Sequence, residues 1–139
     1  MNYGRIALAT VCGMVAYFVV GSAFFILVPQ MINEGRKHSA IFRSREDQMA
    51  GMPAIMAATL VAILVLAALY AMVYRGGSGL AEGARFGALI GVFVVCAFVV
   101  HNYVNLNISL TLALMQAVAH FVQWTVVGTV IGLLYKPSV

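Results

Sequence analysis

The residues best suited to chemistry are three polar side chains inside an apolar stretch near the end of the chain. Gln116, His120 and Gln123 lie within residues 110–135, a run without Asp, Glu, Lys or Arg. At about 100° per helical residue they fall within an arc of roughly 60°, so they form one polar stripe with Trp124 beside it. Polar groups deep in a membrane are costly unless they are paired or hydrated, which makes this stripe the main functional candidate.

Three interpretations of the stripe remain open. It can lock a bundle through interhelical hydrogen bonds, each worth less than about 2 kcal/mol. It can bind a small lipophilic molecule, such as a quinone or a lipid head group, or contact a partner subunit. A proton or ion pathway is the third interpretation, and it is the weakest because the apolar runs lack the acidic residues usual in such relays.

A second group of polar residues follows the third apolar run. His101, Asn102 and Asn105 belong to the sequence HNYVNLNIS, which lacks Lys and Arg and predicts either a capped turn or the mouth of a binding site. His101 and His120 should differ in membrane depth by more than about 10 Å, so one haem iron could not bind both. No catalytic or metal-ligand arrangement is recognisable, and the sequence therefore predicts neither an enzyme nor a metal site. A bound lipid or quinone is the only cofactor that these residues favour.

The elements that position these side chains are membrane helices. The chain has 139 residues, of which 63% are hydrophobic and 9% are charged, and its mean hydropathy is +1.00. Soluble proteins carry about 25% charged residues, so the composition predicts one integral membrane domain over residues 1–139, surrounded by a lipid bilayer. The formal net charge of +4 is spread over loops. The absence of a basic stripe argues against nucleic-acid binding.

Four apolar runs reach the roughly 20 residues that a membrane-spanning helix needs. They predict an all-α bundle of four transmembrane helices arranged as two helical hairpins. The expected spans are approximately residues 6–28, 54–74, 84–104 and 110–135, with a polar loop at residues 29–53. This loop is either a surface helix that places Phe42 at the acyl boundary or a plain loop. Phe18–Val20 recurs as Phe98–Val100, which suggests a weak internal repeat.

Small residues at four-residue spacing predict close helix packing of the GxxxG type. The glycines concerned are Gly13, Gly21, Gly83, Gly87, Gly91, Gly128 and Gly132. We interpret these glycine-rich faces as more than the four helices need for packing against one another. The excess favours an accessory or structural subunit of a larger membrane complex, or a homo-oligomeric scaffold. The alternative is a small oligomeric transporter or channel, or a lipophilic-ligand binding protein that uses the polar stripe.

The positions of Lys and Arg give a weak prediction of topology. One side of the membrane would carry Arg5, Arg75, Arg85 and Lys136, and the other Arg36, Lys37, Arg43 and Arg45. The numbers are equal, but the first group lies close to the span ends, which favours both termini in the cytoplasm.

Several short motifs carry a resemblance to known sequences. They are Tyr17-Phe18 followed by Gly21-Ser22 and Pro29, EGARFGALIG at residues 82–91, and VGTVIGLLY at residues 127–135. Together with the polar loop, they resemble a broad group of small four-span bacterial membrane proteins classified only as a domain of unknown function. The resemblance covers nearly the whole chain and implies the four-span architecture in a bacterial inner membrane. It implies no catalytic residues.

Overall fold

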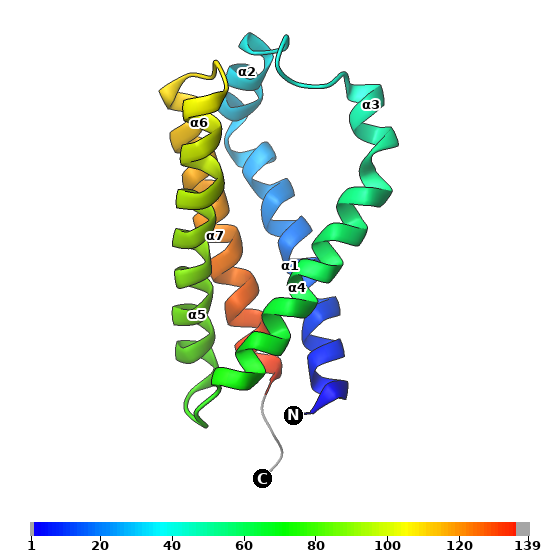
Figure 1. Ribbon diagram of the computed structural model, residues 1–139, viewed down its shortest axis with the longest axis vertical. Coiled ribbons are helices and arrows are strands. Elements are labelled where there is room, and N and C mark those ends of the chain that lie inside the picture. The colour runs from blue at the N-terminus through cyan, green and yellow to red at the C-terminus, as the bar shows by residue number, and fades with distance from the viewer. Residues whose placement is uncertain (1, 136–139) are drawn as a thin grey trace.

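The computed structural model describes residues 2–135 and is helical through most of that range (Figure 1). Four helices are long and apolar enough to cross a membrane, and they are α1 (Tyr3–Leu27), α4 (Met52–Val73), a continuous helix over Gly79–Asn105, and α7 (Leu110–Leu134). The prediction of an all-α, four-span architecture is confirmed, and the protein is an integral membrane protein.

The helix boundaries follow from local sequence signals. The Asn2 side chain accepts a hydrogen bond from the Arg5 backbone N–H at 3.1 Å and caps α1. Pro29 begins the short helix α2 (Pro29–Lys37), at a position where its missing N–H leaves no hydrogen bond unmade. Ser109 caps α7 by accepting from the Leu112 backbone N–H at 3.1 Å.

The third span has three parts, namely α5 (Gly79–Val94), a π-helical turn η1 (Val95–Val100) and α6 (His101–Asn105). It begins at Gly79 rather than near residue 84 as the hydropathy pattern predicts. Glycine weakens an isolated helix by about 1 kcal/mol relative to alanine, but Gly79 and Gly83 are buried, so tertiary packing offsets that cost here.

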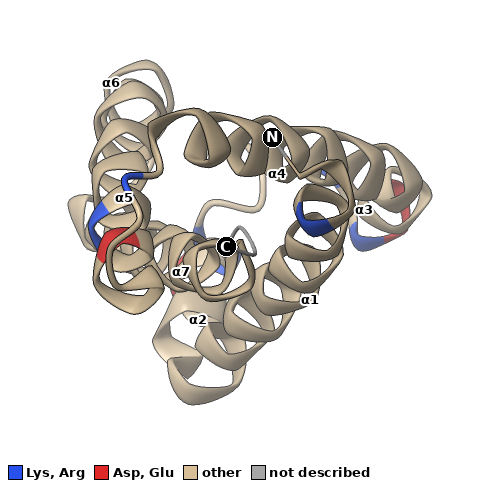
Figure 2. Ribbon diagram, turned by 90° about the horizontal axis from the view of Figure 1, so that it is seen from below, with Lys and Arg blue, Asp and Glu red and all other residues tan. Residues whose placement is uncertain are grey.

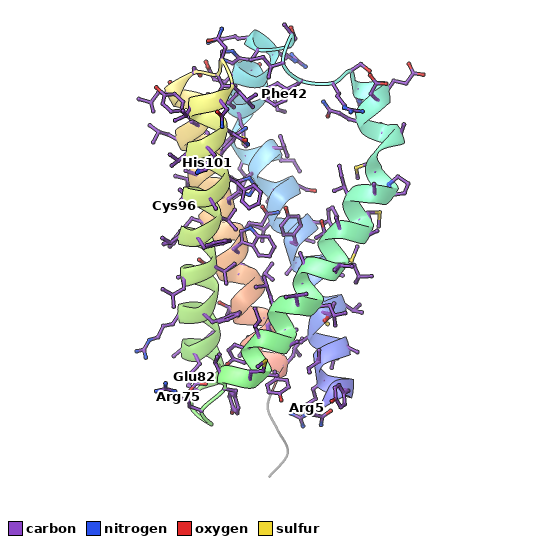
Figure 3. All side chains as sticks on the ribbon, viewed as in Figure 1. Arg5, Phe42, Arg75, Glu82, Cys96 and His101 are labelled. Carbon is purple, nitrogen blue, oxygen red and sulfur yellow. The ribbon has the colours of Figure 1, made fainter. Side chains whose placement is uncertain are left out.

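The polar loop contains two short helices, α2 and α3 (Arg45–Ala50), on either side of residues 38–44. Phe42 lies in the turn between them and not on a surface helix, and 40% of its surface is exposed. Figure 3 shows Phe42 at one end of the bundle and Arg5, Arg75 and Glu82 at the other. The start of α1 and the end of α7 also lie at this second end (Figure 1). Lys136, which the topology argument counts, lies outside the described residues.

Helix α7 is the centre of the bundle. Seen along the bundle, it lies between α5 and α1, while α4 crosses along one side (Figure 2). The main hydrophobic core joins α1, α4 and α7 near the termini and consists of Ile6, Ala9, Ile63, Ala67, Tyr70, Val127, Ile131 and Tyr135. A smaller core at the other end joins η1 to the start of α7 through Val99, Ile108, Leu112 and Ala113.

The two predicted hairpins, α1 with α4 and α5 to α6 with α7, differ in how tightly they pack. Helices α5 and α7 lie side by side along the bundle, whereas α4 leaves α1 as it approaches α3 (Figure 1). The side chains of α4 that are fully buried are Ile63, Ala67 and Tyr70. The α3-proximal half of α4 therefore exposes its large side chains, such as Ile55 and Leu60.

The predicted glycine faces of α5 and α7 contact each other inside the chain. A Cβ added at Gly83 would lie 2.6 Å from the Gly128 carbonyl oxygen, and one added at Gly132 would lie 2.2 Å from the Gly79 carbonyl oxygen. Gly87 and Gly91 face the backbone of α7 at Trp124 and Phe121 in the same way. The premise that these faces are surplus to internal packing is therefore wrong, and a partner would need to contact another surface.

Candidate functional site

The structure divides the polar stripe of α7 into two parts, and Gln123 belongs to the first. Its side chain is 6% exposed, and its Nε2 donates a hydrogen bond to the backbone carbonyl oxygen of Tyr17 in α1 at 2.7 Å. The neighbouring glycine makes room for this approach, since a Cβ at Gly21 would lie 2.8 Å from the Gln123 Nε2. Gln123 thus joins α1 to α7, and a hydrogen bond of this kind stabilises helix association in lipid.

The remaining two residues of the stripe line a cavity between α1, α2 and α7, which we call the inner cavity. Its volume is about 350 Å³, and its polar lining residues are Tyr17, Ser22, Gln116, His120 and Gln123. Aromatic and apolar side chains such as Phe24 and Met31 form the rest of the wall. Ligand sites commonly measure about 300–1,000 Å³ and combine apolar walls with a few polar groups, so the inner cavity has the size and composition of one.

One ring nitrogen of His120, a residue that lines the inner cavity, is left without a hydrogen-bond partner. The Nδ1 of His120 is buried and makes no hydrogen bond within residues 2–135. Leaving a buried polar atom unpaired costs about 1–3 kcal/mol, and the cost is not reduced by water in the hydrocarbon region of a bilayer. A molecule in the inner cavity that offers a hydrogen-bonding group would remove that cost.

The other predicted site residues lie away from the inner cavity. Trp124 packs on the ring of Tyr17, with 5.2 Å between the ring centroids, and supports the cavity wall from outside. His101, Asn102 and Asn105 are exposed on α6, which continues the third span (Figure 3). The structure does not bring these three residues together with His120, so they do not form a mouth to the same site.

A second hollow, which we call the arginine pocket, lies beneath the segment between α2 and α3. Its volume is about 660 Å³, and its basic lining residues are Arg36, Arg43 and Arg45. The topology prediction uses these arginines, and nothing in their spacing shows that residues 38–44 line a hollow together with the start of α7. The arginine pocket adjoins the inner cavity, since Phe25, Met31 and Gln116 line both.

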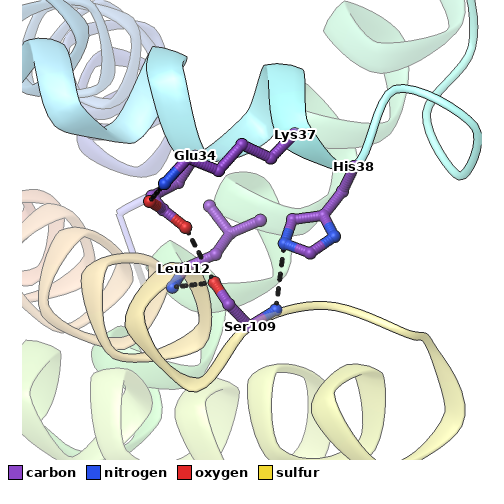
Figure 4. A network of polar contacts seen from close by, with 5 residues as sticks. All are labelled: Glu34, Lys37, His38, Ser109 and Leu112. Atoms are coloured by element: carbon purple, nitrogen blue, oxygen red, sulfur yellow. Dashed lines mark hydrogen bonds and ion pairs between the residues drawn. The ribbon is translucent and has the colours of Figure 1, made fainter.

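A polar network fastens α2 to the start of α7 (Figure 4). Ser109 Oγ donates a hydrogen bond to Glu34 Oε2 at 3.0 Å, and the Ser109 backbone N–H donates to His38 Nε2 at 3.2 Å. Lys37 forms an ion pair with the other carboxylate oxygen of Glu34. The structure half-buries His38 in this contact. The network holds α2, and with it one wall of both hollows, against α7.

Comparison with known sequences identifies the family of this chain. Residues 8–132 match the family described as Protein of unknown function (DUF1761). The chain belongs to the DUF1761 family. No curated protein matches the chain, and no solved structure does. Within the part of this DUF1761 protein that the structure describes, no three His, Cys, Asp or Glu side chains come together as metal ligands would.

The α2–α7 network makes a prediction about pH. The hydrogen bonds from Lys37 and then from Ser109 lower the pKa of the Glu34 carboxyl below its ordinary value, and the charge of Lys37 acts in the same direction. A carboxyl whose pKa is lower in the folded state stabilises the fold above its unfolded pKa and loses that effect as the pH falls through the folded value. We expect Glu34→Gln to lower the thermal unfolding temperature of this DUF1761 protein at neutral pH and to have little effect in strong acid.

The control is Glu46→Gln, which removes the same charge from an exposed position on α3. It should leave the unfolding temperature unchanged across the same pH range. A Glu34→Gln effect of equal size at neutral and acid pH would contradict the assignment of this contribution to the carboxylate.

Proposed function

We propose that the protein binds a lipophilic molecule with a polar group, such as a lipid or a quinone, in the inner cavity. The observation that carries this proposal is that His120 lines the cavity and that its buried Nδ1 has no hydrogen-bond partner within residues 2–135. Gln116, one helical turn away on the same helix, lines the cavity too and provides an amide that both donates and accepts. The apolar wall then surrounds the hydrocarbon part of the molecule.

Binding explains the surroundings of His120 better than catalysis or proton transport does. The carboxylate within the membrane-spanning helices is Glu82, which lies in the first turn of α5 and accepts a hydrogen bond from the Gly77 N–H at 3.0 Å. It lies at the end of the bundle where the termini are (Figure 3). His120 thus has no acidic residue beside it to relay a proton or assist a reaction, and we propose a binding protein rather than an enzyme or a proton pathway.

The proposal predicts that a specific small molecule co-purifies with the protein and depends on His120. We expect the His120→Leu variant to retain about one tenth or less of the compound that the wild type retains. The reason is that leucine offers no hydrogen-bonding group to the bound compound. The measurement is native mass spectrometry of the chain released from its own membrane, followed by organic extraction and identification of the bound compound.

The matched control is His101→Leu, which makes the same change at an exposed position outside the inner cavity. It should retain as much of the compound as the wild type. Equal retention by the wild type and by His120→Leu would contradict the proposed function, and so would a wild-type chain that carries no small molecule.

A second candidate function, a subunit of a larger membrane complex or a homo-oligomer, is favoured by one surface. The α3-proximal half of α4 exposes Ile55, Met56, Leu60 and Val61, and it leaves α1 in the same region (Figure 1). A second membrane helix packed there would bury this half of α4. The same mass spectra test the idea, because a subunit is released with its partners and a homo-oligomer has a multiple of the chain mass.

We further propose a bacterial inner membrane location with both termini in the cytoplasm. The support is that Arg5, Arg75 and Arg85 all lie close to span ends, where cations influence orientation most. Reporter fusions at each terminus and at residue 40 test this, and activity of a cytoplasmic reporter at residue 40 alone would contradict it.

A further inference from the structure

Three arginines line the arginine pocket, and none of them forms an ion pair with an acidic side chain of the described residues. Arg36 comes from α2, Arg43 from the segment that follows it, and Arg45 from the start of α3. Within residues 2–135 the one ion pair is that of Lys37 with Glu34, which leaves all three arginines free of carboxylate partners. A hollow lined by three arginines and no carboxylate attracts anions.

The acidic side chains of the same segment are directed elsewhere. Glu34 accepts hydrogen bonds from Lys37 and Ser109, and Asp47 accepts one from the Ser44 hydroxyl at 2.7 Å. Neither of these carboxylates lines the arginine pocket, and Glu46 does not line it either. The lining of the arginine pocket therefore carries basic side chains and no carboxylate.

The opposite wall of the arginine pocket is apolar and continues into the membrane. Phe25, Met31 and Leu112 line it, and the first two also line the inner cavity. Basic and apolar side chains thus line two adjoining hollows that share part of their walls. This order matches an amphiphile whose head group is anionic and whose chain is hydrocarbon.

We propose that the arginine pocket binds the phosphate head group of an anionic membrane lipid, with an ester-linked chain of that lipid extending into the inner cavity, where an ester carbonyl is the polar group next to His120. This inference rests on the proposed function and names the chemical class of the ligand. Arginine suits the role because its planar guanidinium donates paired hydrogen bonds to phosphate oxygens. The apolar wall favours a lipid over a free anion, since a free anion gains nothing from Phe25 and Met31.

The test compares two lipids that differ only in head group, using the full-length chain in detergent after removal of its own lipid. Dioleoyl-phosphatidylglycerol should bind about tenfold more tightly than dioleoyl-phosphatidylcholine, because charge-assisted hydrogen bonds are stronger when the head group has no cation of its own. The double variant Arg36→Gln/Arg43→Gln should lose this preference. The control, Arg75→Gln/Arg85→Gln, removes the same charge from the other end of the bundle and should keep it.

Each outcome of this test supports or overturns the inference. Unchanged preference in Arg36→Gln/Arg43→Gln, with thermal unfolding like that of the wild type, would overturn it. Displacement of the phospholipid by millimolar inorganic phosphate would show that the arginine pocket binds a free anion rather than a lipid, and it would overturn the inference. Equal binding of both lipids that still depends on His120 would reject the head-group assignment and leave the proposed function intact. A head-group preference that does not depend on His120 would instead reject the proposed role of the inner cavity.

Discussion

Replacing Gly128 by alanine is expected to destabilise the α5–α7 hairpin by about 3 kcal/mol, the upper end of the usual cost of overpacking. The added Cβ would lie 2.4 Å from the Gly87 Cα, 2.5 Å from the Gly87 nitrogen and 2.8 Å from the Gly83 carbonyl oxygen. All three atoms are backbone, so no side-chain rotation can relieve the overlap and the helices must separate. On a lipid-exposed face the same substitution would stabilise the helix by about 1 kcal/mol, so the sign of the effect identifies the packing.

The measurement is the free energy of unfolding in a mixed detergent titration, followed by helical circular dichroism. Gly35→Ala is the control, because a Cβ at Gly35 in α2 meets nothing within 4 Å. It should leave the unfolding free energy unchanged or raise it slightly. A Gly128→Ala variant as stable as Gly35→Ala would show that α5 and α7 do not pack as described.

The second large effect is expected at Tyr70, which attaches α4 to the rest of the bundle. Its side chain is 1% exposed and meets Phe86 of α5 at a centroid distance of 5.3 Å and Tyr135 at 6.1 Å. Truncating a buried aromatic side chain to alanine costs about 3–5 kcal/mol, and few other buried side chains hold α4 in place. We expect Tyr70→Ala to lower the unfolding free energy by about that amount.

Tyr70→Phe separates ring packing from the hydroxyl group. The Tyr70 hydroxyl is buried and makes no hydrogen bond to the described part of the chain, so its removal should be neutral or slightly stabilising. The same unfolding titration measures both variants. Tyr70→Phe as damaging as Tyr70→Ala would show that the hydroxyl, not the aromatic contact, holds α4.

The sequence predicted the parts of the fold that depend on hydrophobic length. The four apolar runs and the paired small residues both report local requirements of helices in lipid. The pairing of the glycine faces was not predictable in the same way. GxxxG spacing shows that a helix can approach another closely, but the identity of the neighbour depends on how the loops fold, and here Gly83 and Gly128 face each other.

The candidate site was partly predictable for the same reason. Periodicity placed Gln116, His120 and Gln123 on one side of α7, but only tertiary structure shows that Gln123 bonds to the Tyr17 carbonyl while His120 lines a cavity. The arginine pocket left no signal in the sequence, because three arginines in a polar loop look the same whether they line a hollow or point into water. Its walls come from α1, α2, α3 and α7 together.

These features combine into one account of the protein. Contacts with α5 and α1 hold α7 in place, and the α2–α7 network around Ser109 fastens α2 to the start of α7. The inner cavity lies between α1, α2 and α7, and the arginine pocket adjoins it. The central claim is that a lipophilic molecule occupies the inner cavity in contact with His120.

Photolabelling in the native membrane tests that claim most directly. The probe is a phosphatidylglycerol with a photoactivatable diazirine in its acyl chain, and labelled positions are mapped by peptide mass spectrometry. The account predicts strong labelling of residues 24–31 and 116–123, at the walls of the inner cavity, and a clear loss of both labels in His120→Leu. Labels confined to outward-facing residues such as Leu60 and Leu89, with none in the cavity walls, would contradict it.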